Sequence, residues 1–346
     1  MSAPDTQQLP QPKDGEHPFA PYVRILGKGK KGSRSLTREE ARHALGMILT
    51  GQVEPVQLGA FLMLIRVKEE TPDELAGFVE AVKDHLTPPD ALQADIDWSS
   101  YAGKRRHAPW FLFSILLLAQ AGLRTFIHGA EGHTAERLYL SDAMAELGLN
   151  PATDWCQAEQ QLSTQGFSYL PLRHFSPGLA EMIDLRPTLG LRSPVHSLAR
   201  LINPLSAPVV IQGIFHPPYL PLHQEAGAML GYKRLAVIKG EGGEIERNPD
   251  NAMGVHKAVM NETGESELQH EEWPALFPRR HVKPADIGMG HMRSVWRGEE
   301  DDEYGIAAVV STAAFALKEA GKAASQEEAL ALAQSLWAER DEGRFG

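Results

Sequence analysis

The segment Asp97–Glu136 constrains the fold of this 346-residue chain more than any other part of the sequence. A short polar stretch leads into three successive cations, Lys104–Arg106. An apolar helix is then expected to begin at Pro109 and to end at Gly122, and Arg124–Ile127 has the composition of a strand. Strand end, loop, helix and strand in this order are typical of an open α/β sheet. Such a sheet binds ligands where loops and helix N-termini gather at the carboxyl ends of its strands.

Alternation of strands and helices continues toward the end of the chain. We expect strands at Arg124–Ile127, Phe167–Pro171, Pro208–Phe215 and Arg234–Ile238, and helices at Pro109–Ala121, Ala135–Leu147, Pro221–Leu230, Gly305–Ala320 and Gln326–Arg340. Strands separated by helices favour a mostly parallel sheet that is covered on both faces. The polar stretch Gly240–His281 is expected to be rich in loops and to carry an edge hairpin.

The first quarter of the chain has a purely helical pattern. Thr37 and Thr71 each begin a capping box, and Pro55 stands at the start of a third amphipathic run. The predicted fold class is therefore α/β, with a small N-terminal helical domain over residues 19–92 and a larger domain over residues 93–346 built on a mostly parallel central sheet flanked by helices. Residues 1–18 are rich in proline, glutamine and aspartate and are expected to form a flexible tail.

Charge is distributed unevenly along the sequence. The formal net charge is −11, which by itself argues against a nucleic-acid partner. The stretch Arg24–Arg42 nevertheless contains seven cations: Arg24, Lys28, Lys30, Lys31, Arg34, Arg38 and Arg42. Such segregation can give a basic groove on an acidic protein. The alternative interpretation is a basic loop that is simply solvated.

Several classes of protein lack support in the sequence. A single cysteine, Cys156, excludes an internal disulfide framework and fits a cytoplasmic location, and it is interpreted as an incidental thiol. The N-terminus has no basic-then-apolar signal pattern. The longest apolar run, Trp110–Ala119, is shorter than the roughly 20 residues that span a bilayer, so no membrane partner is expected. Hydrolase and kinase motifs such as GxSxG and Walker A do not occur.

Histidine and aromatic residues near the cationic segment are the other candidates for ligand contact. Among the 14 histidines, His128 stands at a predicted strand end and is the best candidate, although a structural hydrogen-bonding role is favoured for each of them. Tyr101, His107 and Trp110 lie beside the cations and could stack on unpaired bases. Core packing is the favoured role for Trp110, since bulky apolar residues follow it.

Seven short motifs resemble those of one enzyme family. They are Leu49–Val53, Gln57–Leu62, Gly122–Gly129, Phe167–Pro171, Leu189–Arg192, Leu201–Pro204 and Lys239–Glu244. Together they are similar to elements of the anthranilate phosphoribosyltransferases and their nucleoside-phosphorylase relatives, glycosyltransferase family 3. The resemblance extends over about residues 20–340. It implies that residues 177–203 return to the helical domain and that the protein is a homodimer.

Departures from the family pattern change the expected function. In active members a glycine-rich loop wraps the pyrophosphate of phosphoribosyl pyrophosphate, whereas the corresponding stretch here, Ser100–Arg105, keeps only Gly103. Of the family's metal-binding acidic pair only Glu244 remains, and Ile245 follows it. Arg192, at the position of an anthranilate-side arginine, is kept. This pattern resembles the divergent YbiB-type branch, which binds nucleic acid, as does the segment Ile25–Ala41.

The resemblance and the charge pattern together favour a nucleic-acid-binding protein without anthranilate phosphoribosyltransferase activity. It would grip the backbone of single- or double-stranded nucleic acid in a sequence-independent way. The predicted contacts are Lys28, Lys30, Lys31, Arg34, Lys104, Arg105, Arg106 and Arg192. A relic substrate pocket is expected to contain Tyr101, Gly103, His107, His128, Gly129 and Asn203. No cofactor and no catalytic residue are predicted.

Two alternatives stay open at this point. The first is an active pentosyltransferase that joins phosphoribose to an aromatic or nitrogenous acceptor. It would need magnesium on the leaving pyrophosphate, held by Glu244 and Glu241, with Lys104–Arg106 supplying part of the missing positive charge. The second alternative is a regulator that senses a nucleotide in the relic pocket.

Overall fold

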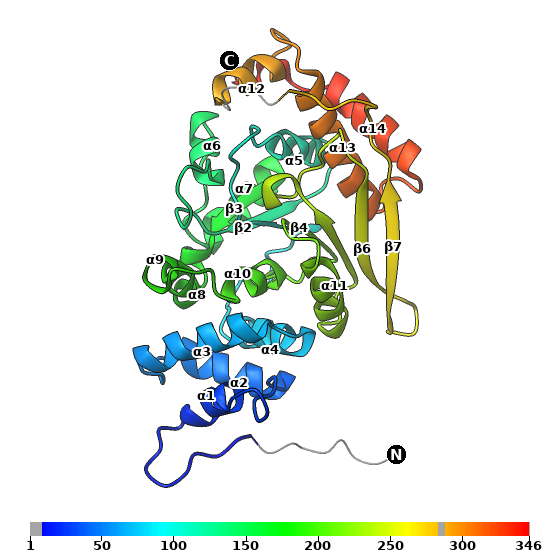
Figure 1. Ribbon diagram of the computed structural model, residues 1–346. Coiled ribbons are helices and arrows are strands. Elements are labelled where there is room, and N and C mark those ends of the chain that lie inside the picture. The colour runs from blue at the N-terminus through cyan, green and yellow to red at the C-terminus, as the bar shows by residue number, and fades with distance from the viewer. Residues whose placement is uncertain (1–8, 283–287, 346) are drawn as a thin grey trace.

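The computed structural model describes residues 9–282 and 288–345 and has two parts, a helical bundle and a larger α/β unit (Figure 1). The predicted fold class is confirmed: a small helical domain precedes a mostly parallel sheet flanked by helices. The expected tail, residues 1–18, is described only from Leu9 onward, and residues 1–8 lie outside the described part.

Four helices form the N-terminal bundle, as their capping signals predict. They are α1 (Ala20–Gly27), α2 (Arg38–Leu49), α3 (Pro55–Lys68) and α4 (Pro72–Lys83). Both predicted threonine capping boxes are present: Thr37 accepts a hydrogen bond from the Glu40 amide and Thr71 from the Glu74 amide. α1 and α2 lie on the side of the bundle away from the sheet (Figure 1).

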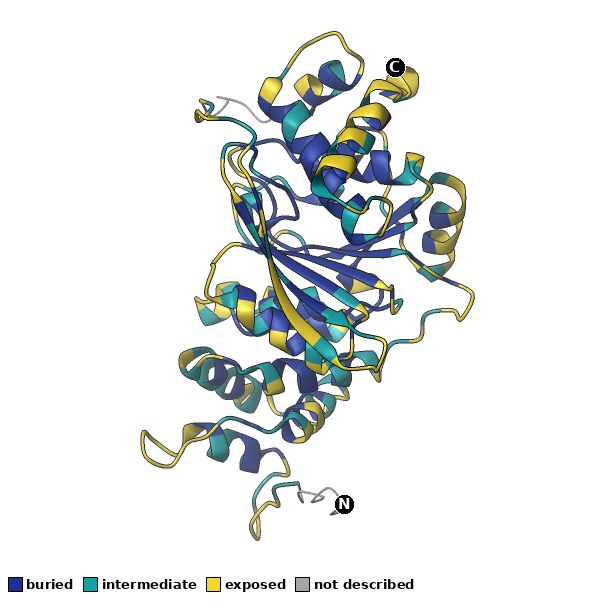
Figure 2. Ribbon diagram, turned by 90° about the vertical axis from the view of Figure 1, so that its right-hand side faces the viewer, coloured by how far each residue is buried: buried dark blue, intermediate teal, exposed yellow. Residues whose placement is uncertain are grey.

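Seven strands form one sheet in the order β3-β2-β1-β4-β5-β6-β7. Strands β1 to β5 are parallel, and β6 and β7 add an antiparallel edge hairpin. Their bounds are β1 Ile96–Ser100, β2 Thr125–Gly129, β3 Phe167–Pro171, β4 Val209–Ile214, β5 Arg234–Lys239, β6 Met253–Met260 and β7 Ser266–Trp273. The central strands are buried on both faces, and the edge strand β7 is largely exposed (Figure 2).

Helices cover both faces of the sheet. On one face α5 (Phe111–Gln120) packs against α13 (Glu303–Glu319), which in turn packs against α14 (Gln326–Ala338). On the other face α11 (Tyr219–Met229) contacts β5, β6 and α4. The remaining helices are α6 Leu140–Glu146, α7 Trp155–Gln165, α8 Pro177–Asp184, α9 Arg186–Leu189, α10 Val195–Leu198 and α12 Met289–Trp296, with short 3-10 turns η1 Leu172–His174, η2 Ala199–Leu201, η3 Glu241–Gly243 and η4 Glu342–Phe345.

Differences from the expected elements have local reasons. The predicted helix 135–147 forms only over Leu140–Glu146, because Thr134–Tyr139 makes a turn in which the Tyr139 hydroxyl accepts a hydrogen bond from the Thr134 amide. Strand β1 and helices α7 and α12 were absent from the sequence interpretation. β1 alternates too little to be recognised, since all five of its residues are buried.

The strand order reverses between β1 and β4, and this sets the position of the functional site. β2 and β3 follow on one side of β1, whereas β4 and β5 lie on the other. The loops that leave β1 and β4 therefore diverge and leave a crevice at the carboxyl edge of the sheet. The segment from 177 to 203 forms α8, α9, α10 and η2, and α10 packs against α4. Within the described residues no helix is both long and apolar enough to cross a membrane.

Gly77 allows α4 to lie directly against α2. A Cβ atom at this position would stand 2.1 Å from the Arg38 carbonyl oxygen. We expect Gly77→Ala to lower the free energy of unfolding by about 1–3 kcal/mol, because the helices must separate. Gly46→Ala is the matched control: no atom lies within 4 Å of its added Cβ, so better helix propensity should raise stability by about 1 kcal/mol. Urea unfolding measures both, and equal responses would contradict the close contact.

Candidate functional site

The loop that follows β1 donates hydrogen bonds to the buried carboxylate of Glu244. Its Oε1 accepts hydrogen bonds from the amides of Ala102 at 2.6 Å and Gly103 at 2.7 Å, and its Oε2 accepts one from Ser100 Oγ at 2.8 Å. Only 1% of Glu244 is exposed. Paired backbone amides in such a loop are a natural site for a phosphate. Here an internal carboxylate already occupies them.

A second glutamate, Glu246, fills the helix start that follows. Its Oε2 accepts a hydrogen bond from the Phe111 amide, the first residue of α5, at 2.9 Å. Its Oε1 lies 2.5 Å from Lys104 Nζ, and both side chains are buried. The anion site expected at this helix N-terminus is thus satisfied within the chain. Lys104 was wrongly assigned to a binding surface, because it neutralises a buried carboxylate.

Glu244 also does not fit the role of a magnesium ligand. Burial raises the pKa of its carboxyl, while the hydrogen bonds from Ser100, Gly103 and Ala102 oppose that rise. Its oxygens are committed to these donors, and the next residue, Ile245, is fully buried. In the described part of the chain no three His, Cys, Asp or Glu side chains are grouped so that they could hold a metal ion.

Two residues of the expected relic pocket lie in the protein interior instead. The Tyr101 hydroxyl is 2.8 Å from His128 Nδ1, and His128 Nε2 is 3.3 Å from Asp97 Oδ1. All three side chains are essentially inaccessible. His128 was the best histidine candidate for ligand contact, and it has the structural hydrogen-bonding role that the sequence analysis favoured for each histidine. Trp110 is buried against Gly305, which confirms its predicted core packing.

The other predicted pocket residues are also structural, with one exception. Asn203 is buried, and its side chain hydrogen-bonds to both the amide and the carbonyl of Ala207. Gly129 lies so close to β1 that a Cβ would stand 1.9 Å from the Ser100 carbonyl oxygen. Gly103 adopts φ +68° and donates its amide to Glu244. Only His107, whose ring stacks on Tyr304 at 4.4 Å, lines an open hollow.

An arginine cluster surrounds the β1 loop on its other side: Arg137, Arg186, Arg192 and Arg200. Each guanidinium donates to neutral oxygens. Arg137 reaches the carbonyls of Ala102 at 2.9 Å and Gly103 at 3.0 Å. Arg186 and Arg192 share the Thr134 hydroxyl, and Arg200 donates to the His196 carbonyl. None of the four forms an ion pair with an acidic residue in the described ranges.

The electrostatics of the arginine cluster show uncompensated positive charge. Burial lowers the pKa of Arg192 to about 10, and repulsion by Arg200, Arg186 and Arg137 contributes to that shift. Burial lowers the pKa of His133 to about 4, and three of these arginines contribute although the Tyr101 carbonyl opposes the shift. Burial lowers the pKa of Arg200, and the negative charge of Glu244 opposes that shift. An anionic ligand would relieve this repulsion.

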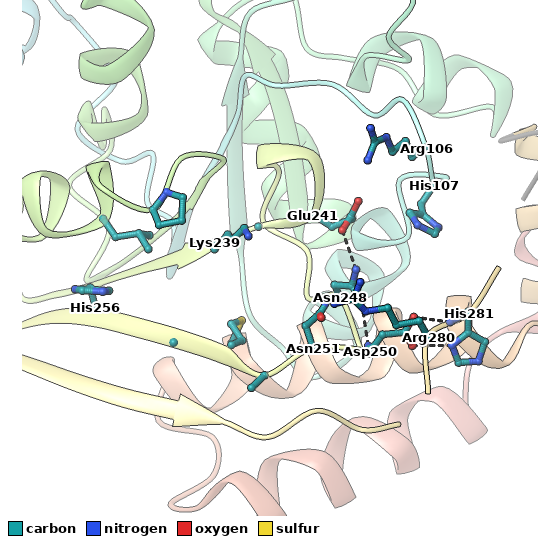
Figure 3. Close-up of a pocket in the computed structure, with 16 residues that line it drawn as sticks. Arg106, His107, Lys239, Glu241, Asn248, Asp250, Asn251, His256, Arg280 and His281 are labelled. Atoms are coloured by element: carbon teal, nitrogen blue, oxygen red, sulfur yellow. Dashed lines mark hydrogen bonds and ion pairs between the residues drawn. The ribbon is translucent and has the colours of Figure 1, made fainter. Parts of the chain in front are cut away.

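Two concave surfaces meet at the carboxyl edge of the sheet. We name the first the cleft; it measures 410 Å³ and its lining includes Arg66 of α3 together with Arg192 and Arg200. We name the second the hollow; it measures 690 Å³ and contains the exposed cations Arg106, Lys239 and Arg280. Figure 3 shows these three side chains around the hollow, where Glu241 bonds to Asn248 and Asp250 to His281.

The N-terminal basic stretch is largely neutralised. Four of its seven cations form ion pairs: Arg24 with Glu16, Arg34 with Glu40, Arg38 with Glu80 and Arg42 with Asp84. The predicted contact Arg34 is among them. Lys28, Lys30 and Lys31 are exposed and form no ion pair with a described residue. Their loop lies between α1 and α2, away from the sheet edge (Figure 1). Arg105 is exposed but pairs with Glu136 at 2.9 Å.

Several site residues were not predicted from the sequence. Arg137, Arg186 and Arg200 lie far apart in the chain, and Glu246 is one of 45 acidic residues. One signal was present: Lys239 and Phe215 stand at the carboxyl ends of runs that have the composition of strands. In a parallel sheet that position faces the ligand edge.

Known proteins resemble this chain in sequence. Residues 21–86 match the model of the glycosyl transferase family, helical bundle domain. The chain is 29% identical over 237 residues to the uncharacterized protein YbiB of Escherichia coli (strain K12), covering 67% of this chain and 73% of that one. It is 28% identical over 298 residues to the anthranilate phosphoribosyltransferase of Desulfitobacterium hafniense (strain Y51), with coverages of 83% and 85%. Residues 21–86 thus match the helical bundle domain of the glycosyl transferase family, and most of the chain is similar to anthranilate phosphoribosyltransferases.

Solved structures of anthranilate phosphoribosyltransferases have the same fold as this chain. The crystal structure of anthranilate phosphoribosyltransferase from Thermus thermophilus aligns with a TM-score of 0.73 at 24% identity, covering 92% of this chain and 94% of that one. The side chains of the β1 loop and the cleft are those described above, and they differ from the pattern that the sequence resemblance implied for active members.

The buried pair of Lys104 and Glu246 should behave as a structural unit. Lys104→Met should lower the free energy of unfolding by about 3–5 kcal/mol, since Glu246 then remains as an uncompensated buried charge. The double change Lys104→Met with Glu246→Gln should recover much of that loss. Arg105→Met, at an exposed ion pair, should change stability by less than about 1 kcal/mol. Chemical unfolding of the four proteins tests this, and a mild effect of Lys104→Met alone would contradict the buried pairing.

Proposed function

We propose that this protein binds nucleic acid through its phosphate backbone, on a phosphoribosyltransferase-like scaffold, and that it does not catalyse the anthranilate reaction. One observation carries the proposal: a chain of net charge −11 gathers, at the carboxyl edge of its sheet, cations that form no ion pair with an acidic residue among those the structure describes. An acidic protein that leaves such cations unpaired in concave surfaces has a selective affinity for anions.

Arginine geometry favours phosphate as the anion. Three cleft cations, Arg66, Arg192 and Arg200, are guanidinium groups, which present paired N–H donors that match phosphate oxygens. The cleft and the hollow together present cations from α3, the β1 loop, the end of β5 and the segment after β7. A ligand that carries several phosphates along an extended chain engages such separated charges better than a compact one. Backbone contacts of this kind supply affinity without sequence readout.

Glu244 argues against tight binding of a sugar pyrophosphate in the β1 loop. Its carboxylate holds both loop amides, and a pyrophosphate placed there would have to displace it. A displaced Glu244 would then add negative charge beside the incoming anion. Transfer of phosphoribose depends on preorganised donors that are free to bind the leaving group, and Glu244 occupies the donors of this loop.

We also propose that the protein acts as a homodimer joined through its N-terminal helices. Val56 and Val67 of α3 are 79% and 81% exposed, which leaves apolar surface on the bundle. The unpaired lysines Lys28, Lys30 and Lys31 belong to the same bundle, so a dimer would add their charge to the assembly.

A salt titration tests nucleic-acid binding directly. Fluorescence anisotropy of a labelled single-stranded oligonucleotide should show binding at low salt, with log affinity falling linearly as log salt rises. The combined change Arg106→Gln, Lys239→Gln and Arg280→Gln should make that slope shallower by about 0.7 for each phosphate that is no longer neutralised. The reason is that a phosphate without a cationic partner keeps its condensed counterions when the protein binds.

Arg279→Gln is the matched control for this experiment. Arg279 neighbours Arg280 and is equally a surface arginine, but it is paired with Glu303 at 2.5 Å and does not line the hollow. Its substitution should leave the slope unchanged. An identical response of the control and the triple variant, or the absence of binding by the unaltered protein at low salt, would remove the proposal.

Phosphoribosyl transfer is the second candidate function, and the similarity to named anthranilate phosphoribosyltransferases favours it. We expect no consumption of isotope-labelled phosphoribosyl pyrophosphate with magnesium and anthranilate, nicotinate or a pyrimidine, because Glu244 occupies the loop amides. Turnover that disappears in Arg192→Ala would establish this second function. It would also show that the substrate displaces the Glu244 carboxylate from the amides of the β1 loop.

A further inference from the structure

An exposed aromatic side chain stands at the centre of the site. Phe215 follows the last residue of β4, and 52% of it is accessible to solvent. In the described part of the chain it is the one aromatic residue among the exposed large hydrophobic side chains. Leaving a phenylalanine half in water forfeits burial that other aromatic residues of this protein achieve. A ligand with an apolar face would bury the exposed part of this ring.

Phe215 stands on the ridge between the cleft and the hollow. Phe215, His216 and Pro218 line the cleft, whereas Pro217 lines the hollow. Two successive prolines restrict φ in this short segment, so the ridge is stiff. The Phe215 ring packs edge to face against His216, with centroids 4.9 Å apart. This contact supports one edge of the ring and leaves its exposed surface toward solvent.

Loops from three strands converge beneath the ridge. A Cβ atom on Gly243, in η3 after β5, would stand 3.2 Å from both the Ala102 Cβ of the β1 loop and the Phe215 Cβ after β4. Phe215 therefore lies at the crevice created by the reversal of strand order. Cations flank it on both sides: Arg192 and Arg200 in the cleft, and Arg106 and Lys239 in the hollow.

We propose that Phe215 is a stacking platform for an unpaired base of a single-stranded nucleic acid whose backbone crosses the ridge from the cleft to the hollow. The proposal rests on the nucleic-acid function proposed above and specifies its ligand: a single strand rather than a duplex. One phosphate lies against the cleft arginines and a later one against the hollow cations, while the base between them covers the Phe215 ring. Each base presents a π face, so stacking is tolerant of sequence.

Alternating phosphate and base contacts match what a single strand offers and a duplex does not. In a duplex the bases are stacked on each other, and their faces are inaccessible to a side chain. A lone nucleotide could occupy the cleft, but it would leave the cations of the hollow unused. The arrangement of cation, aromatic ring and cation along one edge fits a strand that continues past the ring.

The test compares Phe215→Ala and Phe215→Trp with the unaltered full-length protein, using a labelled oligothymidylate at constant salt. Phe215→Ala should weaken binding by about 5- to 100-fold, the loss expected when one base–aromatic contact is removed. Phe215→Trp should keep or improve affinity. The salt slope should be the same in all three proteins, since no phosphate contact is changed. Leu268→Ala is the matched control, because Leu268 is also 52% exposed but lies on β7.

An abasic oligonucleotide of the same length separates stacking from a general effect on the surface. It retains the phosphates but has no bases, so the unaltered protein and Phe215→Ala should bind it equally. A Phe215→Ala affinity for oligothymidylate equal to that of the unaltered protein would overturn the stacking proposal while leaving the proposed function intact. The stacking proposal is equally overturned if Phe215→Ala weakens binding of the abasic strand as much as that of the normal one, or if light scattering shows that it changes the oligomeric state.

Failure of the proposed function gives a different result. In that case the unaltered protein binds neither the normal nor the abasic strand at low salt. This result overturns both the proposed function and the stacking proposal. Preference for a duplex of the same sequence over the single strand, unaffected by Phe215→Ala, would support the proposed function and exclude the stacking platform.

Discussion

The hydrogen bonds from the β1 loop to the Glu244 carboxylate determine what this site can do. Two backbone amides and a serine hydroxyl converge on one buried side chain that comes from beyond β5. An unpaired buried amide costs about 1–3 kcal/mol, so the loop needs an acceptor at this point. Because the chain supplies that acceptor itself, the loop has a defined shape without a ligand. It does not present an open cradle of amides.

A second buried carboxylate, that of Glu246, also satisfies polar groups within the chain. Glu246 accepts from the first amide of α5 and pairs with Lys104, so the helix N-terminus and the adjacent lysine satisfy each other through one carboxylate. Internal anions thus replace external ones at both positions where a phosphate is expected from the fold. The cations that form no ion pair with a described carboxylate lie in the cleft and the hollow, where a larger anion has access to them.

Burial separates the cations of this protein into two kinds with different roles. Lys104 is buried and ties the β1 loop to Glu246 in the segment after β5, whereas Arg106, two residues later, is exposed in the hollow. The N-terminal arginines resemble Lys104 in having carboxylate partners, although they lie nearer the surface. A count of positive charges along the sequence overstates the binding surface, since paired cations contribute little net attraction to an incoming anion. The cations that form no ion pair with a described carboxylate determine where a polyanion binds.

The sequence by itself determined the fold class, the helix starts at Thr37, Pro55 and Thr71 and four of the strands, because these features depend on local periodicity and on capping side chains close in the chain. It also determined that Trp110 is a core residue. Only the tertiary structure decided which cations are available. The partners of Lys104, Glu244 and Arg137 come from segments that are distant in sequence, and the tertiary fold brings them together. The reversal of strand order places Phe215 between two cationic surfaces, an arrangement that no local pattern encodes.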